Sequence, residues 1–346
     1  MRFQPPSLRQ LYPGYFALAM ATGIMSTVLH ENRHYRTSAV LLGIDVACFA
    51  VLCVLYVLRT VRYPAAVRAD LTAPDRAFAF FTFVAACNVL GARLAVDGHR
   101  TLTFALAVVS LVAWAGLSYG VPAQLILGPR PRPVLAGVNG TWFIWVVGTQ
   151  SIAIACAVLE RGPRYARAAA LAATLMWSVG VVLYLVVATM VLVRLLLLEV
   201  TAEDLSPPYW IAMGATAITV LAAARLLDMN ATPITVATRP IVAGLGVILW
   251  AFGTWLVPLL VVFSLWRFRL SHRLSYAPPL WSVVFPLGMY AAASLELSTV
   301  ERLPLVADIG RAASWVALAV WAVVFAGMLH AIASTRHTGL VREPGA

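Results

Sequence analysis

Residues 142–151 of this chain read WFIWVVGTQS: two aromatic residues, Trp142 and Phe143, begin a hydrophobic segment, and Thr149 follows six residues after the second aromatic. Four further copies occur, at Tyr15-Phe16 with Thr22, Phe80-Phe81 with Cys87, Tyr209-Trp210 with Thr216 and, more weakly, Leu280-Trp281 with Leu287. Successive copies are 65, 62, 67 and 71 residues apart. A unit of this length holds two membrane-crossing helices with their loops. The repeat therefore predicts five helical hairpins in a quasi-five-fold bundle around a central pore.

The composition places the chain in a membrane. Of its 346 residues, 62% are hydrophobic and 11% are charged, and the mean hydropathy is +0.87. Because a soluble domain needs many more charged residues, we predict an all-α integral membrane protein with a single transmembrane domain over residues 1–346. Ten segments are long and apolar enough to span a bilayer, at residues 13–30, 38–59, 76–96, 101–127, 139–159, 166–198, 208–227, 240–266, 278–298 and 309–334.

The positive charge is carried by arginine alone. All 25 basic residues are arginine, and the formal net charge is +11. These arginines lie in short loops, where such residues set topology and contact lipid head groups, so we expect no nucleic-acid partner. The densest clusters, within residues 59–76 and 267–273, favour cytoplasmic N- and C-termini in a multi-pass protein of the cytoplasmic (inner) membrane.

The odd-numbered spans differ from the even-numbered spans after the aromatic pair. Odd spans contain small or hydrogen-bonding residues, whereas even spans such as 166–198 are rich in Val, Leu and Ala. This contrast predicts that the odd spans are inner and that the even spans face lipid or a neighbouring subunit. Two interpretations of the small residues stay open: close helix packing and the lining of a pore. The candidate lining residues are Met20, Thr22, Gly23, Cys87, Asn88, Thr149, Gln150, Gly214, Thr216 and Ser282.

The fifth copy of the repeat differs from the others at Phe285, which Pro286 follows. In an ungapped alignment, the other four copies have Met20, Ala85, Val147 and Gly214 at this position. Proline kinks a helix and frees a carbonyl, which a membrane tolerates where neighbours or a water-filled cavity satisfy the freed group. Phe285 and Pro286 are therefore candidates for a hydrophobic gate, and the alternative is an ordinary packing residue at a structural kink.

No pattern indicates a metal, a cofactor or catalysis. The four cysteines lie in predicted spans without CxxC spacing, and the six histidines lie at span ends or in loops. The chain has no HExxH motif, phosphate loop or set of residues for a Ser-His-Asp triad. We expect no cofactor, no metal and no enzymatic activity.

Two stretches resemble a known family. Residues 13–24 (PGYFALAMATGI) and 281–288 (WSVVFPLG) are similar to the tellurite-resistance/dicarboxylate transporter family, which includes bacterial TehA, fungal malate permeases and the slow-type anion channels of plant guard cells. The resemblance extends over essentially the whole chain. It implies five inner helices around a pore, assembly as a homotrimer, transport of anions, and a pore closed by a phenylalanine of the ninth span, here Phe285.

With cytoplasmic termini, the N-termini of all five odd spans surround the inner mouth of the bundle, and their N–H groups favour anions. Four arginines just before these starts form a predicted anion funnel: Arg9, Arg76, Arg132 and Arg273. Deeper in the bundle, the odd spans contain no arginine until Arg93 and Arg225. Small inorganic or organic anions should therefore bind weakly and pass quickly.

The sequence favours an anion channel or channel-like exporter and leaves two alternative functions open. The runner-up is a proton-coupled transporter of C4-dicarboxylates such as malate and succinate, or of tellurite or sulfite. Asp45 is the only acidic residue well inside a predicted span, which makes it the candidate coupling acid, unless it serves as a hydrogen-bonding partner for a neighbouring helix or subunit. A membrane enzyme or scaffold is the third alternative.

Overall fold

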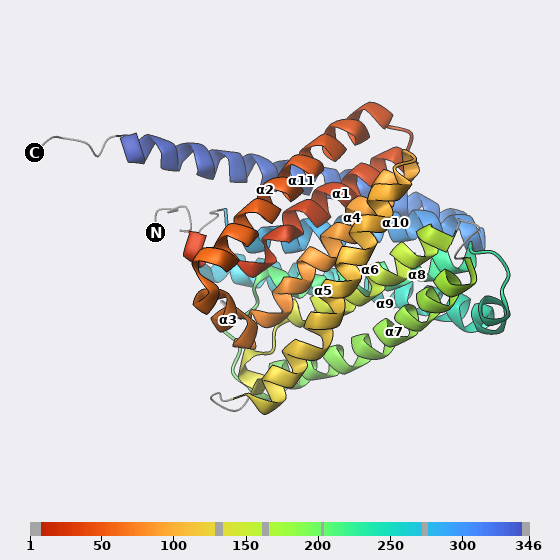
Figure 1. The fold of residues 1–346 in the computed structure, drawn as a ribbon, viewed down its shortest axis with the longest axis horizontal. Coiled ribbons are helices and arrows are strands. Elements are labelled where there is room, and N and C mark those ends of the chain that lie inside the picture. The colour runs from red at the N-terminus through yellow and green to blue at the C-terminus, as the bar shows by residue number, and fades with distance from the viewer. Residues whose placement is uncertain (1–7, 129–133, 161–165, 202–203, 272–275, 341–346) are drawn as a thin grey trace, which may run out of the picture.

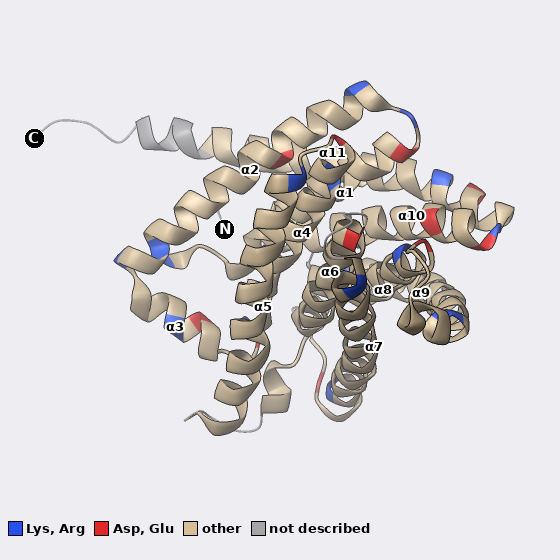
Figure 2. Ribbon diagram, turned by 45° about the vertical axis from the view of Figure 1, so that its right-hand side comes forward, with Lys and Arg blue, Asp and Glu red and all other residues tan. Residues whose placement is uncertain are grey.

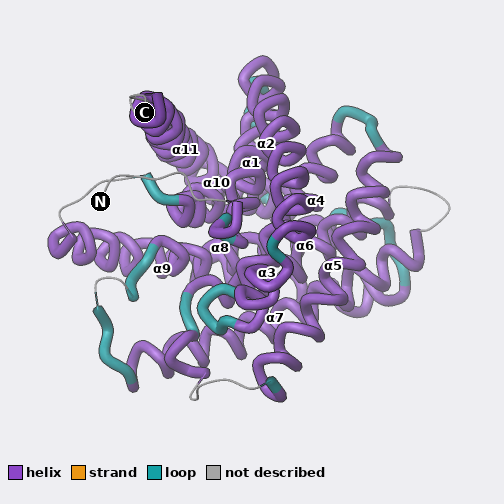
Figure 3. Tube along the Cα trace, turned by 60° about the vertical axis from the view of Figure 1, so that its left-hand side comes forward, coloured by secondary structure: helices purple, strands orange, loops and turns teal. Residues whose placement is uncertain are grey.

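The computed structural model of the chain describes residues 8–128, 134–160, 166–201, 204–271 and 276–340. Within these ranges the chain forms helices and loops and no β-strand (Figure 3). The α-helices are α1 (Ala17–Glu31), α2 (Tyr35–Arg62), α3 (Pro64–Thr72), α4 (Phe81–Val96), α5 (Arg100–Leu127), α6 (Phe143–Glu160), α7 (Ala166–Leu197), α8 (Ile211–Leu227), α9 (Pro233–Ser271), α10 (Trp281–Glu301) and α11 (Pro304–Leu340).

In the described part of the chain, nine helical segments are long and apolar enough to cross a membrane. They coincide with the second to the tenth of the predicted spans. The first predicted span, 13–30, is not among them, and its α-helical part, Ala17–Glu31, has 15 residues. The short helix α3, Pro64–Thr72, was not predicted. The chain is a multi-pass, all-helical membrane protein.

Five of the helices begin with a turn of 3₁₀-helix. These turns are Pro13–Phe16 before α1, Ala77–Phe80 before α4, Gly140–Trp142 before α6, Pro207–Trp210 before α8 and Pro278–Leu280 before α10. Three of the turns have proline at their first positions, where its fixed φ suits a helix start and its missing N–H has no cost. The aromatic pair of each sequence repeat therefore lies at the junction between a 3₁₀ turn and an α-helix.

These same five helices contact one another in a closed order, and we call them the ring helices. α1 contacts α4, α4 contacts α6, α6 contacts α8, α8 contacts α10, and α10 contacts α1. The outer helices α2, α5, α7, α9 and α11 each lie against the ring helix that precedes them in the sequence. Figure 1 shows that α11 continues past the bundle at its C-terminal end.

Burial separates the two groups of helices. In an 18-residue stretch of each apolar segment, 61–83% of the residues are buried for α4, α6, α8 and α10, against 17–28% for the outer helices. The exposed side chains of the outer helices are largely apolar, as lipid-facing side chains are. Arginine and acidic residues lie mostly near helix ends (Figure 2). The bundle thus has an apolar band of the kind that a bilayer covers.

Small residues let the ring helices approach closely. A Cβ added at Gly214 of α8 would lie 2.9 Å from Cγ of Pro286 on α10. A Cβ at Gly288 of α10 would lie 2.9 Å from Cγ2 of Ile24 on α1. At these two contacts the packing interpretation of the small residues holds.

Candidate functional site

A cavity of about 380 Å³ lies inside the ring, toward the C-terminal ends of its helices. All five ring helices contribute to its wall. At one level along the ring the lining residues are Ile24, Val89, Ser151, Ile218 and Met289. We call this cavity the vestibule.

On each ring helix, a second residue lies four positions before the vestibule-lining residue just named. It is the position at which the fifth sequence copy, with Phe285, differs from the other four. These residues are Met20, Ala85, Val147, Gly214 and Phe285, and all five are buried. Residues four apart lie on the same face of an α-helix, one turn away from each other. The five residues therefore form a layer one turn closer to the helix N-termini than the vestibule lining, and we call it the closing layer. Phe285, which is 2% exposed, is its largest side chain.

The threonines predicted to line a pore have hydroxyls that face the outer helices instead. Oγ1 of Thr22 accepts a hydrogen bond from the indole N–H of Trp321 on α11 at 3.1 Å, and Oγ1 of Thr149 accepts one from Trp114 on α5 at 2.9 Å. Thr216 lies against α9, where a Cβ added at Gly253 would come 2.5 Å from its Oγ1. A buried indole N–H needs an acceptor, and these contacts supply it.

The other predicted lining residues are distributed between the two sides of the ring. Asn88 does line the vestibule, where it donates to Ser151 at 2.9 Å and accepts from Ser110 at 2.7 Å. Gln150 donates to the carbonyl of Trp177 on the outer helix α7. Cys87 and Ser282 are buried, and a pore-lining role for them stays a prediction.

Asp45 of α2 lies against the backbone of a ring helix. Its side chain is buried, and neither carboxylate oxygen has a hydrogen-bond partner among the described residues. A Cβ added at Gly23 of α1 would lie 2.6 Å from Oδ2 of Asp45 and 2.9 Å from Cγ1 of Val89. Because Val89 lines the vestibule, Asp45 is close to the vestibule wall but behind it. The predicted pore residue Gly23 is therefore the point of contact between α1 and Asp45.

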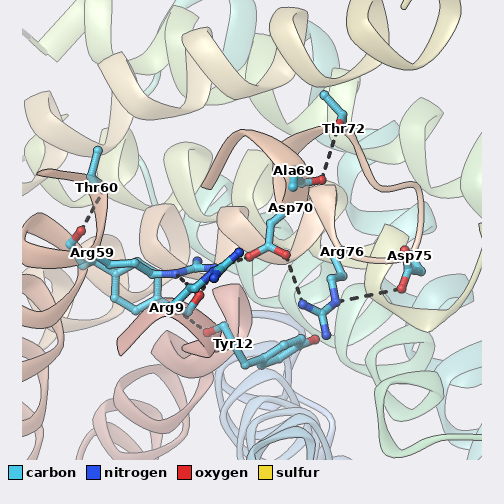
Figure 4. A network of polar contacts seen from close by, with 10 residues as sticks. Arg9, Tyr12, Arg59, Thr60, Ala69, Asp70, Thr72, Asp75 and Arg76 are labelled. Carbon is cyan, nitrogen blue, oxygen red and sulfur yellow. Dashed lines mark hydrogen bonds and ion pairs between the residues drawn. The ribbon is translucent and has the colours of Figure 1, made fainter. Parts of the chain in front are cut away.

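At the opposite end of the ring, the funnel arginines near α1 and α4 belong to a polar network (Figure 4). Asp70 of α3 pairs with Arg59 of α2 and, at 3.0 Å, with Arg76. Arg59 also donates to the backbone carbonyl of Arg9. Asp70 thus offsets the charge of Arg76. Because Arg59 contacts both Asp70 and Arg9, it also links α3 to the N-terminal segment. Arg132 and Arg273 lie outside the described residues.

The vestibule end of the ring carries its own charges. Arg93 of α4 pairs with Asp97 at 3.0 Å and donates to Ser26 at 3.1 Å. Arg225 of α8 contacts Glu31 of α1 at 3.5 Å and also pairs with Glu296 of α10. Arg93 and Arg225, which lie near the far ends of the odd spans, are therefore both paired with acidic residues. The sequence pattern did not indicate these pairs.

Among the described residues, no group of three or more His, Cys, Asp and Glu side chains is placed to hold a metal ion. The four cysteines are unpaired thiols, and Cys87 is the most deeply buried of them.

A closed ring of apolar helices with an internal cavity defines a multi-pass membrane protein of the channel or transporter class. The sequence profile of the SLAC1 family, which is described as a voltage-dependent anion channel, matches residues 10–329. The chain belongs to this family, and the resemblance noted in the sequence is confirmed. The family is of the channel and transporter type rather than enzymatic.

Similar proteins occur in bacteria and archaea. An uncharacterized membrane protein of Mycobacterium tuberculosis (strain H37Rv) is 50% identical over 155 residues, which are 44% of this chain and 78% of that protein. Two uncharacterized transporters of Methanocaldococcus jannaschii are 25% identical over 328 and 325 residues, in each case 91% of this chain, and 92% and 93% of their own lengths.

Proposed function

We propose that the chain is an anion channel or channel-like exporter whose path runs through the ring helices and is closed by Phe285. One observation carries this proposal: the residues of the closing layer lie one helical turn before the five vestibule-lining residues, on the same faces of their helices. The path would therefore continue from the vestibule through the closing layer. Ten spans in a quasi-five-fold arrangement, with the first span at residues 13–31, are part of this proposal.

The closing layer would act as a hydrophobic gate. Its five side chains are apolar or absent, so an anion crossing it would lose hydration without gaining a hydrogen-bond donor. In this proposal Phe285 fills the centre of the layer, where the small residues Ala85 and Gly214 leave room for its ring. Pro286 of α10 packs against Gly214 of the neighbouring ring helix α8, which holds this part of α10 close to α8. Selectivity would follow the cost of dehydration, so nitrate should pass more readily than chloride, and sulfate least.

The gate is tested by anion flux into proteoliposomes. Phe285→Ala should raise nitrate flux by roughly tenfold or more, which corresponds to a barrier lowered by about 1.4 kcal/mol. The nitrate flux of Phe285→Leu should lie between those of Phe285→Ala and wild type. The matched control is Phe143→Ala, because the Phe143 ring packs on Tyr184 of the outer helix α7. Equal flux for Phe285→Ala and wild type, in protein that is folded, would sink the gate assignment.

The orientation and assembly complete the proposal. With both termini in the cytoplasm of an inner-membrane protein, the 3₁₀ turns surround the cytoplasmic mouth and the vestibule opens toward the outside. The outer helices would then face lipid or the neighbouring subunits of a homotrimer, the assembly that the family resemblance implies. The mass of the purified complex and the accessibility of cysteines introduced at either end check these two points.

A proton-coupled carrier is the second candidate function, and the unpartnered Asp45 favours it. An ionisable side chain that is buried inside a span without a hydrogen-bond partner is costly, and such residues in membrane proteins commonly mark proton or ion pathways. Its proximity to Val89 gives a short route from the vestibule. A carrier would show saturable malate or succinate uptake driven by a pH gradient and abolished by Asp45→Asn. Flux that is unchanged in Asp45→Asn would remove this candidate.

A further inference from the structure

Three charged residues from three ring helices meet at the vestibule. Arg225 of α8 lies between Glu31 of α1 and Glu296 of α10, and both carboxylates contact the same nitrogen, Nη2. The Arg225 and Glu31 side chains line the vestibule. Their side chains are 24% and 23% exposed, and that of Glu296 is 19% exposed, so the cluster is partly shielded but reachable from the cavity. Oε2 of Glu31 is buried and has no hydrogen-bond partner among the described residues.

The charges of this cluster do not balance when every group is ionised. One guanidinium and two carboxylates sum to −1, and the nearby C-terminal ends of α1 and α8 add partial negative charge. An anion in the vestibule would then be repelled, and Nη2 of Arg225 would already be occupied. A proton on the carboxyl pair makes the sum zero, and a second proton makes it +1.

The other ionisable groups at this end of the ring do not supply the positive charge that would balance the two carboxylates around Arg225. Arg93 is paired with Asp97 and contacts His30, Glu160 accepts a hydrogen bond from Asn230, and Arg239 donates to the carbonyl of Leu227. Among the described residues, the ionisable groups of this end of the bundle outside the cluster are His30, Arg33, His34, Arg36, Arg93, Asp97, His99, Arg100, Glu160, Arg167, Asp228, Arg239, Glu301 and Arg302, with the Asp308–Arg311 pair on α11. Of these, His30, Arg93, Arg100 and Asp228 also line the vestibule; the charge of Arg93 is offset by Asp97, and Arg100 and Asp228 contribute one charge of each sign.

We propose that Arg225, Glu31 and Glu296 form a proton-linked anion-binding site in the vestibule. Protonation of the carboxyl pair releases Nη2 of Arg225, which then donates to a small anion such as nitrate or to one carboxylate of a larger one. Loss of the proton returns Arg225 to its acidic partners and expels the anion. Anion occupancy of the vestibule therefore rises with acidity on the vestibule side, and an anion and a proton bind together. The site regulates the path of the proposed function and so rests on it.

Binding can be measured without transport, which keeps this site separate from the gate. The probe is sodium nitrate, added to the purified full-length protein in detergent at pH 5.0, 6.5 and 8.0 with ionic strength held constant by sodium gluconate. The readout is the rise in the thermal unfolding midpoint with nitrate concentration, which yields an apparent dissociation constant. If one proton binds with each anion, the wild-type constant falls by up to about tenfold for each unit by which the pH is lowered.

Two variants and a control test the assignment. The double variant Glu31→Gln/Glu296→Gln should bind nitrate with the acid-pH affinity of wild type at all three pH values, within about twofold. Arg225→Gln should weaken binding by about tenfold or more at pH 5.0, and Arg225→Lys, which keeps the charge, should retain part of it if Arg225→Gln fails to fold. Arg100→Gln is the control, because it removes a positive charge from the vestibule wall outside the cluster.

A wild-type nitrate affinity that does not depend on pH overturns the proposal, as does a double variant that keeps the wild-type pH dependence or an Arg225→Gln variant that binds normally. These outcomes leave the gate standing if Phe285→Ala still raises flux. Conversely, pH-linked nitrate binding in a protein whose flux does not respond to Phe285→Ala would support the site and reject the gate.

Discussion

Replacing Thr149 by valine separates a structural role from a pore-lining role. Oγ1 of Thr149 accepts the indole N–H of Trp114 and donates to the carbonyl of Trp145, both at 2.9 Å. Valine keeps the shape of the side chain but removes the acceptor, which leaves a buried N–H unpaired. Such a loss costs about 1–3 kcal/mol in soluble proteins, whereas hydrogen bonds between membrane helices average about 0.6 kcal/mol. We therefore expect a loss of about 1 kcal/mol, which is roughly a fivefold change in the unfolding equilibrium constant.

The assay is reversible unfolding in micelles, combined with nitrate flux. A double-mutant cycle with Trp114→Phe should give a coupling energy of about 0.6–1.7 kcal/mol, because the two side chains share one hydrogen bond. Thr60→Val is the control, since the exposed Thr60 hydroxyl bonds only to the carbonyl of Tyr56 in its own helix. Flux through Thr149→Val should stay within about twofold of wild type. The reasoning fails if Thr149→Val leaves stability unchanged and alters nitrate flux.

Two further predictions concern the helix ends. Arg59→Met should destabilise the protein by about 3 kcal/mol in the same unfolding assay, because the largely buried Asp70 loses one of its two cationic partners. Removing the exposed Arg311 should cost less than about 0.5 kcal/mol, and equal losses would contradict the argument. Burial opposes ionisation of Asp204, but hydrogen bonds from the loop and from Arg194 outweigh it and lower the pKa of Asp204. The ionised carboxylate therefore stabilises the fold above the usual pKa of 3.8, and this contribution disappears as the pH falls through the lower folded value. Asp204→Asn should accordingly lose stability at pH 7 and match wild type near pH 2; an equal loss at both pH values would refute this linkage.

The apolar architecture was accessible from the sequence, because span length and repeat period are properties of the chain itself. Nine segments of the structure match predicted spans, and the four aromatic pairs, with Leu280-Trp281 in the fifth copy, mark the starts of the five ring helices. The exception is the first segment, in which a 3₁₀ turn precedes an α-helix of only 15 residues. Helix α3 does not follow from the search for spans, because its nine residues include Arg68 and Asp70 and are too few to cross a bilayer.

The direction of the threonines could have been inferred from the sequence and was not. Each residue advances about 100° around an α-helix, so positions two apart lie about 200° apart. Thr22 follows Met20 by two residues, and Thr149 follows Val147 by two. If Phe285 and its equivalents face the axis, the threonines must therefore face the outer helices. Their tryptophan partners could not be inferred in the same way, because Trp114 and Trp321 come from helices with no fixed register to the repeat.

The acidic partners of Arg225 were hidden for a different reason. Glu31 and Glu296 are separated from each other by most of the chain and meet at Arg225 only because α10, which lies beside α8, also contacts α1 and so closes the ring. This closure gives the path two unlike parts: an apolar layer one helical turn from the vestibule lining, and a vestibule whose guanidinium is already paired. On the proposed path, an anion that binds Arg225 has to displace a carboxylate, and the closing layer beyond it offers the anion no hydrogen-bond donor. In the proposed function the closing layer is the barrier to anion passage, and in the proposed site the charged vestibule makes anion occupancy depend on protons, so the two have to be altered separately to assign their effects.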